Sequence, residues 1–206
     1  MRALQTGPTR ARAAAVACTA PGIIGRPLHS PFSRVPAALV VRPSADADLD
    51  AVTAIYADAV IHGTGTFELE TPTADEMAQR RAAVLACGWP WLVAEREGKV
   101  LGYAYASDFR PRRAYRFCLE DSIYVDPRAK GMGVGHALLA ELLARCEARG
   151  ARQMLAVIGD SANLASVALH RAAGFRDCGR FDAAGWKFDR WLDVELMKRA
   201  LGSGAT

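Results

Sequence analysis

Acidic residues are absent from the first 45 positions of this chain, although six arginines lie there. The formal charge of +4 comes from this segment, because the other 20 basic residues of the 206-residue chain are outnumbered by 22 acids. Residues 46–206 therefore carry a net charge of −2. Since nucleic-acid binding usually needs a clustered basic face, this distribution argues against a nucleic-acid partner.

Paired cysteines and long apolar stretches are missing as well. The five cysteines are widely spaced and form no C-x-x-C pair, which argues against a disulfide framework or a zinc site. No apolar run reaches the roughly 18 residues that a transmembrane helix needs. We therefore expect a cytoplasmic protein with no bound metal and no membrane partner.

Regular periodicity is also missing from residues 1–37, which contain five prolines and several arginines. We expect this segment to be a disordered extension, followed by one domain at residues 38–200. An arginine-rich segment without acids is typical of an organelle transit peptide, but an overextended start of the reading frame gives the same composition. The sequence leaves both interpretations open.

Periodic patterns begin at Ala38. Apolar residues at helical spacing predict helices, and short apolar or alternating runs predict strands. The expected helices lie at residues 46–61, 73–87, 133–149 and 163–173, and the expected strands at 38–42, 91–95, 100–109, 117–125, 154–158, 178–182 and 186–197. This order predicts a mixed α/β domain with one central sheet flanked by helices.

A glycine-rich segment lies between a predicted strand and a predicted helix. Its glycines, Gly131, Gly133 and Gly135, alternate along the chain, and Arg128 and Lys130 precede them. Such glycines allow successive backbone N–H groups to point at one ligand, and the following helix N-terminus favours an anion. The spacing fits neither a P-loop nor a G-x-G-x-x-G motif. A pyrophosphate group is the natural ligand, with a plain flexible turn as the alternative.

A second motif lies in the helix predicted at residues 163–173. Asn163 opens this helix and His170 follows two helical turns later, so both side chains face the same side. Gly174 can end the helix in the left-handed conformation. A packed or solvated histidine is the simpler alternative for His170.

A carboxylate interrupts the strand predicted at residues 117–125. Glu120, Ser122 and Tyr124 share one face of this strand, whereas Asp121 points to the opposite face. Glu120 is therefore a candidate general base for an amine, with an ordinary surface acid as the alternative. Cys118 shares that face and makes an acyl-enzyme route conceivable, but no histidine adjoins it in the sequence.

The loop read as Arg128-x-x-Gly131-x-Gly133 resembles the coenzyme A loop of the GCN5-related N-acetyltransferase (GNAT) superfamily. Asn163, His170 and the Gly174-Phe175 pair resemble its second coenzyme A element, with histidine in place of the commoner tyrosine. Segments such as residues 64–68 and 185–193 further resemble phosphinothricin and methionine sulfone/sulfoximine N-acetyltransferases. The resemblance extends from about Val40 to Met197 and implies a largely antiparallel GNAT sheet.

The resemblance implies transfer of an acetyl group from acetyl-CoA to the amine of a small amino-acid-like substrate. Glu120 is the expected base, His170 the expected acid for the departing thiolate and Tyr124 its reserve. The implied acetyl-CoA residues are Ser122, Ile123, Tyr124, Lys130, Gly131, Met132, Gly133, Val134, Gly135 and Asn163. The implied substrate residues are Phe109, Arg110, Pro111, Leu119, Glu120 and Asp121.

Several alternatives stay open at this point. The same fold could acetylate a protein N-terminus or an aminoglycoside, or bind coenzyme A without catalysis. Family members often carry a histidine before the Val-Glu pair, whereas this chain has Phe117-Cys118-Leu119, so the substrate is not fixed. A homodimer is a further expectation from the resemblance, and the Trp186–Trp191 segment is its candidate surface.

Overall fold

The computed structural model describes residues 37–205, and the extension expected at residues 1–37 lies outside them except for its last residue. The division into an extension and a domain at 38–200 stays a prediction. The elements are β1 (Val40–Pro43), α1 (Leu49–His62), α2 (Ala74–Ala86), β2 (Trp91–Arg96), β3 (Lys99–Asp108), β4 (Cys118–Val125), α3 (Val134–Ala148), β5 (Gln153–Gly159), α4 (Leu164–Ala172), β6 (Arg176–Lys187) and β7 (Arg190–Ala200), with short 3₁₀ turns between some of them.

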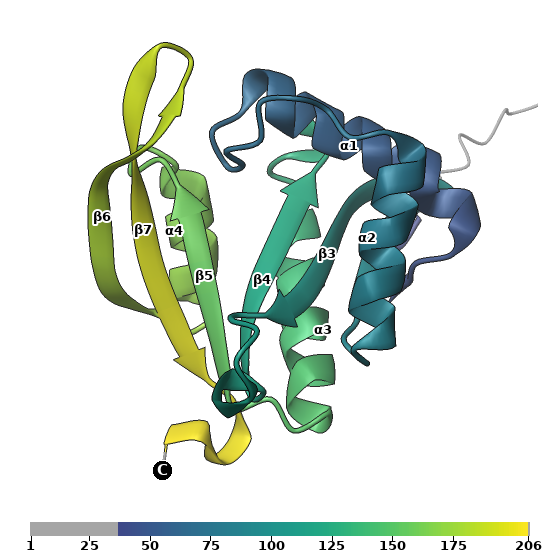
Figure 1. Cartoon of the computed structure of the whole chain (residues 1–206). Helices are drawn as coiled ribbons and strands as arrows, with labels where there is room; N and C mark the ends of the chain where they lie inside the picture. Colours follow the sequence, from purple (N-terminus) through teal and green to yellow (C-terminus); the bar gives the residue numbers. More distant parts are fainter. Residues whose placement is uncertain (1–36, 206) are drawn as a thin grey trace, which may run out of the picture. The chain divides into compact units, whose positions relative to one another are not determined.

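One seven-stranded sheet runs through the domain in the order β1-β2-β3-β4-β5-β7-β6 (Figure 1). All neighbouring strands are antiparallel except β4 and β5, which are parallel. This confirms the prediction of a mixed, largely antiparallel α/β sheet, and the order of helices and strands also agrees with the sequence periodicity.

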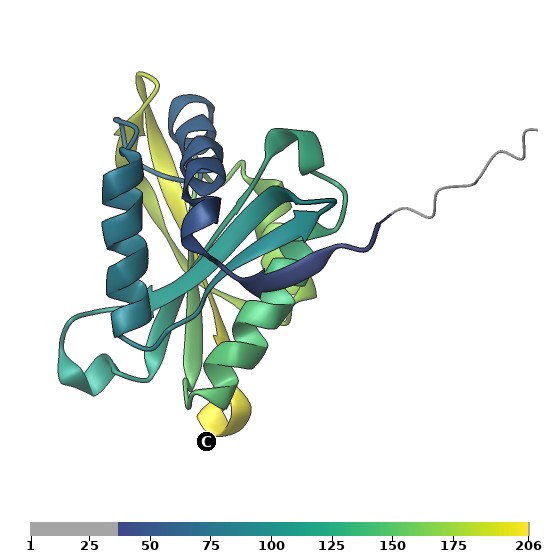
Figure 2. The same ribbon diagram turned by 90° about the vertical axis from the view of Figure 1, so that its right-hand side faces the viewer.

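Helices cover both faces of the sheet (Figures 1 and 2). Successive residues of β2 point to opposite faces, as they must in a strand. Trp91 and Val93 therefore pack with α1 and α2 in one core, whereas Leu92 and Ala94 pack with α3 in the other. The side chains of β4 are divided between these two layers in the same way.

Local sequence signals explain where several elements begin and end. Thr73 caps α2, and its hydroxyl accepts a hydrogen bond from the Glu76 N–H while the Glu76 carboxylate accepts one from the Thr73 N–H, which is the expected capping box. Gly174 follows α4 with φ at +84°. None of the helices described between residues 37 and 205 combines the length and apolar character needed to cross a membrane.

The last two strands differ from the prediction. The sequence predicted one strand over residues 186–197, but the structure places a tight turn at Phe188 and Asp189, both with positive φ. Trp186 and Lys187 therefore end β6, and β7 begins at Arg190. Alternate residues are apolar up to the turn, at Trp186 and Phe188, and again after it, at Leu192 and Val194, so periodicity alone did not locate it. Beyond β7, Leu201 is buried in the core, so packing continues past residue 200.

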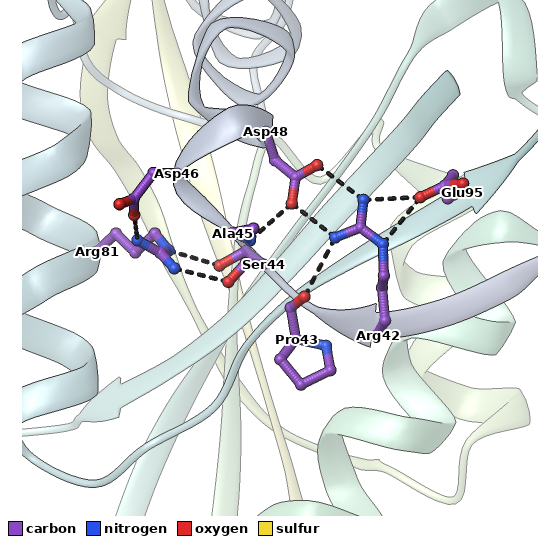
Figure 3. A network of polar contacts seen from close by, with 8 residues as sticks. All are labelled: Arg42, Pro43, Ser44, Ala45, Asp46, Asp48, Arg81 and Glu95. Carbon is purple, nitrogen blue, oxygen red and sulfur yellow. Dashed lines mark hydrogen bonds and ion pairs between the residues drawn. The ribbon is translucent and has the colours of Figure 1, made fainter. Parts of the chain in front are cut away.

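An ion-pair network fixes the start of α1 against β1 and β2 (Figure 3). Asp48 is buried, and its carboxylate accepts hydrogen bonds from Arg42 at 2.7 and 2.8 Å and from the Ala45 N–H at 2.7 Å. Arg42 also donates to Glu95 at 2.8 Å. The Arg42 hydrogen bond, which outweighs burial, lowers the pKa of Asp48. The charge of Asp48 is thus compensated by the Arg42 guanidinium and the Ala45 N–H.

Candidate active site

The two central strands separate at the middle of the sheet. β4 and β5 pair only over Cys118–Glu120 and Gln153–Leu155, whereas β4 stays paired with β3 as far as Val125. Figure 1 shows the two strands diverging beyond that point. Beyond Glu120, β4 therefore has no neighbouring strand on its β5 side. Backbone groups there are available to an extended ligand, because an unpaired strand edge can accept another strand-like chain.

A cavity of about 1030 Å³ fills the separation. Its walls come from the end of α1 and the following loop, from β4, from the glycine-rich loop, from β5 and from α4. Nearly all the predicted catalytic and acetyl-CoA residues line it: Glu120, Ser122, Ile123, Tyr124, Lys130, Gly131, Gly133, Val134, Gly135, Asn163 and His170. Met132 does not line the cavity and is half exposed beside it.

The glycine-rich loop has the conformation that an anion site needs. Gly131 and Gly133 have φ values of +78° and +80°, which side-chain-bearing residues rarely adopt. Gly133 caps α3, whose first turn presents N–H groups without acceptors inside the helix. Arg128 instead turns back onto Asp126, at 2.6 Å. The loop therefore fits a diphosphate through backbone amides and the exposed Lys130 rather than through Arg128.

Glu120 lies half-buried in the cavity wall. Burial raises its pKa, the charge of Asp121 raises it further, and Arg110 acts in the opposite direction. A carboxyl group with a raised pKa is a stronger base once ionised, so Glu120 suits proton transfer from an amine. Tyr124 lies on the same face of β4, and burial raises its pKa well above the usual value, so its phenol keeps its proton.

His170 and Asp121 form a buried pair between α4 and β4. The His170 Nε2 lies 3.0 Å from Asp121 Oδ2, and its Nδ1 lies 2.7 Å from the Ser166 carbonyl oxygen. Asp121 therefore points away from the Glu120 face, as the alternation of the strand predicted. Asn163 caps the same helix, and its side-chain oxygen accepts a hydrogen bond from the Ser166 N–H.

Comparison with known proteins identifies the family to which the chain belongs. The Acetyltransferase (GNAT) family matches residues 61–175. A phosphinothricin N-acetyltransferase of Alcaligenes faecalis is 54% identical over 169 residues, covering 82% of this chain and 86% of that protein. An L-methionine sulfoximine/L-methionine sulfone acetyltransferase of Pseudomonas paraeruginosa is 41% identical, covering 77% and 92%. The chain belongs to the GNAT family of acetyltransferases. The predicted family and enzyme class are thus confirmed.

A solved GNAT structure shares the fold. The phosphinothricin acetyltransferase of Sinorhizobium meliloti, in complex with AcCoA, is 50% identical and superposes with a TM-score of 0.79, covering 82% of this chain and 91% of that one. This GNAT chain is therefore an acetyl-CoA-dependent N-acetyltransferase. Among residues 37–205, no group of three or more His, Cys, Asp or Glu side chains is arranged to hold a metal ion.

The loop between α1 and α2 forms one side of the GNAT cavity, although the sequence motifs did not predict this part of the site. Thr66 and Phe67 line the cavity, and the buried Lys187 donates to the Thr66 carbonyl oxygen at 2.8 Å. The loop also lies directly over Gly159 and Gly185. A Cβ atom at Gly159 would lie 2.3 Å from the Thr64 carbonyl oxygen, and one at Gly185 would lie 2.1 Å from the Phe67 ring. Glycines within strands signal such a close approach, so these two could have revealed the loop.

Four predicted substrate residues do not line the cavity. Phe109, Arg110 and Pro111 lie in the loop that joins β3 to β4. Leu119 lies in β4, and its side chain is completely buried in the core. A substrate contact by Leu119 is therefore limited to its backbone. Arg110 is exposed, and its guanidinium lies 4.7 Å from the centre of the Phe109 ring. Their roles in substrate binding stay predictions.

We expect Gly159→Ala to raise the KM for the amine substrate by about tenfold, because the new Cβ would displace the Thr64 carbonyl and shift the cavity wall. Steady-state kinetics with the amine varied at saturating acetyl-CoA measures the effect. Gly65→Ala is the control in the same loop, since its Cβ would come no closer than 3.7 Å to the Asn163 amide. Equal effects of the two substitutions would contradict this account.

Proposed function

We propose that this GNAT enzyme acetylates the α-amine of small amino acids whose side chains carry an anionic or strongly polar oxygen group, such as a phosphinate or a sulfone. The observation that carries the proposal is that Glu120 and the anion-binding loop Lys130–Gly135 line one cavity. A carboxylate base and a diphosphate site within one cavity serve the two substrates of an acetyl transfer.

In this proposal each group of the chain has a defined task. Acetyl-CoA supplies an activated acetyl group when it is bound. The amides of Lys130–Gly135 hold the diphosphate, with Met132 beside them, and the free edge of Ser122–Tyr124 positions the pantetheine arm, next to Asn163. Glu120 takes a proton from the amine, and backbone N–H groups near Ile123 stabilise the developing oxyanion. His170 donates a proton to sulfur, with Tyr124 as the reserve donor.

Four arginines in the loop before β4 support a substrate with an anionic or strongly polar side chain. Arg110, Arg112, Arg113 and Arg116 are exposed, and none forms an ion pair within the described part of the chain. Guanidinium groups bind carboxylate and phosphinate oxygens in a bidentate manner. Arg110 is also close enough to Glu120 to influence its pKa, so this loop can bring an anionic substrate toward the base.

A panel of amines tests the proposal. The full chain and a chain shortened to begin at Ala37 are each mixed with acetyl-CoA, a thiol reagent, and phosphinothricin, methionine sulfone, unmodified amino acids, N-terminal peptides or aminoglycosides. We expect fast thiol release with the first two compounds and little with peptides or drugs. Preference for peptides or aminoglycosides would favour the alternative substrates. No release with any amine would indicate a coenzyme A-binding module.

We also propose that the β6–β7 hairpin is the contact surface of a homodimer. Its aromatic side chains Phe181, Trp186, Phe188 and Trp191 are all at least half exposed, and the rings of Trp186 and Trp191 contact each other with their centres 5.1 Å apart. Exposed apolar patches mark interaction sites. A cytoplasmic location and the absence of nucleic-acid and membrane partners stay predictions from the sequence.

We expect Trp186→Glu/Trp191→Glu to turn a dimer into a monomer, because two charges would have to be buried at the contact. Light scattering after size-exclusion chromatography measures the mass. Lys99→Glu, in the exposed β2–β3 hairpin, is the control for an added acid. A wild-type protein that is already monomeric at micromolar concentration would contradict the proposal.

A further inference from the structure

The buried pair of His170 and Asp121 is more than a packing contact. Their side chains are 5% and 2% exposed, respectively, and they join α4 to β4 across the cavity wall. Phe175 closes the pair from one side, with its ring at 5.0 Å and nearly perpendicular to the imidazole. An ionisable pair in such surroundings is retained only where its hydrogen bonds are satisfied or where it has a task.

The hydrogen-bond geometry fixes the number of protons. The Ser166 carbonyl oxygen can only accept, so Nδ1 of His170 must carry a proton. Nε2 faces the Asp121 carboxylate at 3.0 Å, and this contact also needs a proton. The pair therefore holds two protons, whereas a neutral imidazole beside an ionised carboxylate would hold one. Burial alone lowers the pKa of His170, but Asp121 and the Ser166 carbonyl together outweigh burial and raise it.

Few other titratable groups surround the pair. On β4 the neighbouring carboxyl group is Glu120, and on α3 Cys146 interacts electrostatically with Asp121. The β5 segment Gln153–Gly159 contains no titratable residue, and on α4 Arg171 pairs with Asp177 at the surface. On β7, Arg199 donates to the Ala173 carbonyl at the end of α4. Of the carboxylates named here, Asp121 is the one that forms a hydrogen bond with His170, so it is the carboxylate that raises the pKa of the imidazole.

Glu120 and Asp121 lie on opposite faces of β4 at the point where the sheet separates. Glu120 lies on the face that packs against α1 and α2, together with Tyr105 and Tyr124. Asp121 lies on the other face, with α3 and α4. Both line the cavity beside the free edge of the strand. Two proton-handling groups thus flank the place where an acyl group would be transferred.

We propose that Asp121 is a positioning residue that orients His170 and holds its second proton ready for the departing thiolate. The proposal rests on the proposed function and deepens it. In the step concerned, the amine N–C bond forms and the thioester C–S bond breaks. The amine proton passes to Glu120. The hydrogen bond between His170 Nε2 and Asp121 opens, and the Nε2 proton passes to sulfur, which leaves a neutral imidazole beside an ionised Asp121. Solvent then moves the proton of Glu120 back to the pair.

The test is Asp121→Asn, which keeps the shape of the side chain. The amide N–H of asparagine can donate to the unprotonated Nε2 of a neutral imidazole, so the pair would keep its hydrogen bond but lose its extra proton. We expect kcat to fall by about ten- to thirtyfold, with the KM for acetyl-CoA within about twofold of wild type. The basic limb of the kcat profile should move to lower pH, because Asp121 no longer raises the pKa of His170.

A readout without substrate separates this proposal from the proposed function. Nitrogen-15 NMR of the histidine rings reports which nitrogens carry protons, and His170→Gln assigns the signal among the four histidines. We expect a doubly protonated His170 ring at pH 7 in wild type and a neutral ring in Asp121→Asn. Asp48→Asn is the matched control, because Asp48 is another buried, paired aspartate but lies in the network of Figure 3. It should leave the kcat profile and the His170 signal unchanged.

A neutral His170 ring in wild type, or an unchanged kcat profile in Asp121→Asn, would overturn the proposal and leave the pair a purely structural contact. If no amine is acetylated by the wild type, the proposed function fails, and the NMR comparison alone still decides where the proton lies.

Discussion

We expect Glu120→Gln to lower kcat by about 10²- to 10⁴-fold, the range that a positioned general base supplies. The amide has the shape of the carboxyl group but cannot take a proton from an ammonium substrate. Since Glu120 lies on the opposite face of β4 from the His170 pair, and since its side chain is not one of the backbone amides proposed to hold the diphosphate, the dissociation constant of acetyl-CoA should hardly change. Rapid-quench kinetics together with isothermal titration of acetyl-CoA measures both quantities.

The same substitution should stabilise the fold above neutral pH. Burial and Asp121 raise the pKa of Glu120, so the ionised carboxylate is less favourable in the folded than in the unfolded chain. That unfavourable contribution is present at high pH and disappears as the pH falls below the ordinary pKa of glutamate. The melting temperature of Glu120→Gln should therefore equal or exceed that of wild type at pH 8 and converge with it at low pH.

Glu141→Gln is the matched control for Glu120→Gln. Glu141 lies on α3 and pairs at the surface with Arg145, at 2.7 Å. We expect this variant to keep wild-type kcat. A Glu120→Gln enzyme that keeps more than about half of the wild-type kcat, at any pH between 6 and 9, would show that another group takes the amine proton.

We expect Gly131→Val/Gly133→Val to weaken acetyl-CoA binding by about a hundredfold or more. Both glycines have φ near +80°, and forcing a β-branched residue into that region costs about 1–3 kcal/mol at each position. The exposed loop will relax to another conformation, so its amides no longer converge on the diphosphate. Isothermal titration with acetyl-CoA and with desulfo-CoA measures the loss.

The control for the loop variant is Gly98→Val, in the hairpin between β2 and β3. Gly98 also has positive φ, at +75°, but lies outside the cavity. The Gly98→Val protein should be less stable than wild type but keep its affinity for acetyl-CoA. Unchanged binding by the double variant would contradict the assignment of the anion site.

The sequence predicted those parts of the site that depend on local geometry. The alternation of β4 placed Glu120 and Asp121 on opposite faces, and the two-turn spacing placed Asn163 and His170 on one side of α4. The glycine spacing indicated a loop of positive φ. The first two features follow from the fixed repeats of strand and helix, and the third from the missing Cβ of glycine, so no tertiary information was needed.

Other parts of the site depend on contacts between distant segments. The pairing of His170 with Asp121 joins positions 49 residues apart, and the hydrogen bond from Lys187 to Thr66 joins positions 121 apart. No local pattern specifies such pairs. The turn at Phe188 and Asp189 was missed because the apolar pattern resumes beyond it and because Phe188, unlike Asp189, is not typical of a positive-φ turn. Leu119 was assigned by resemblance to the substrate site, whereas alternation places its side chain in the core.

The central claim is direct acetyl transfer to an amine bound beside Glu120. Enzyme at micromolar concentration is mixed with ¹³C-acetyl-CoA and methionine sulfone, quenched within one turnover, and analysed by intact-protein and small-molecule mass spectrometry. We expect the label on the substrate amine and at no time on the protein. Label on Cys118 would instead establish an acyl-enzyme, and label that stays on coenzyme A with every amine would contradict catalysis altogether.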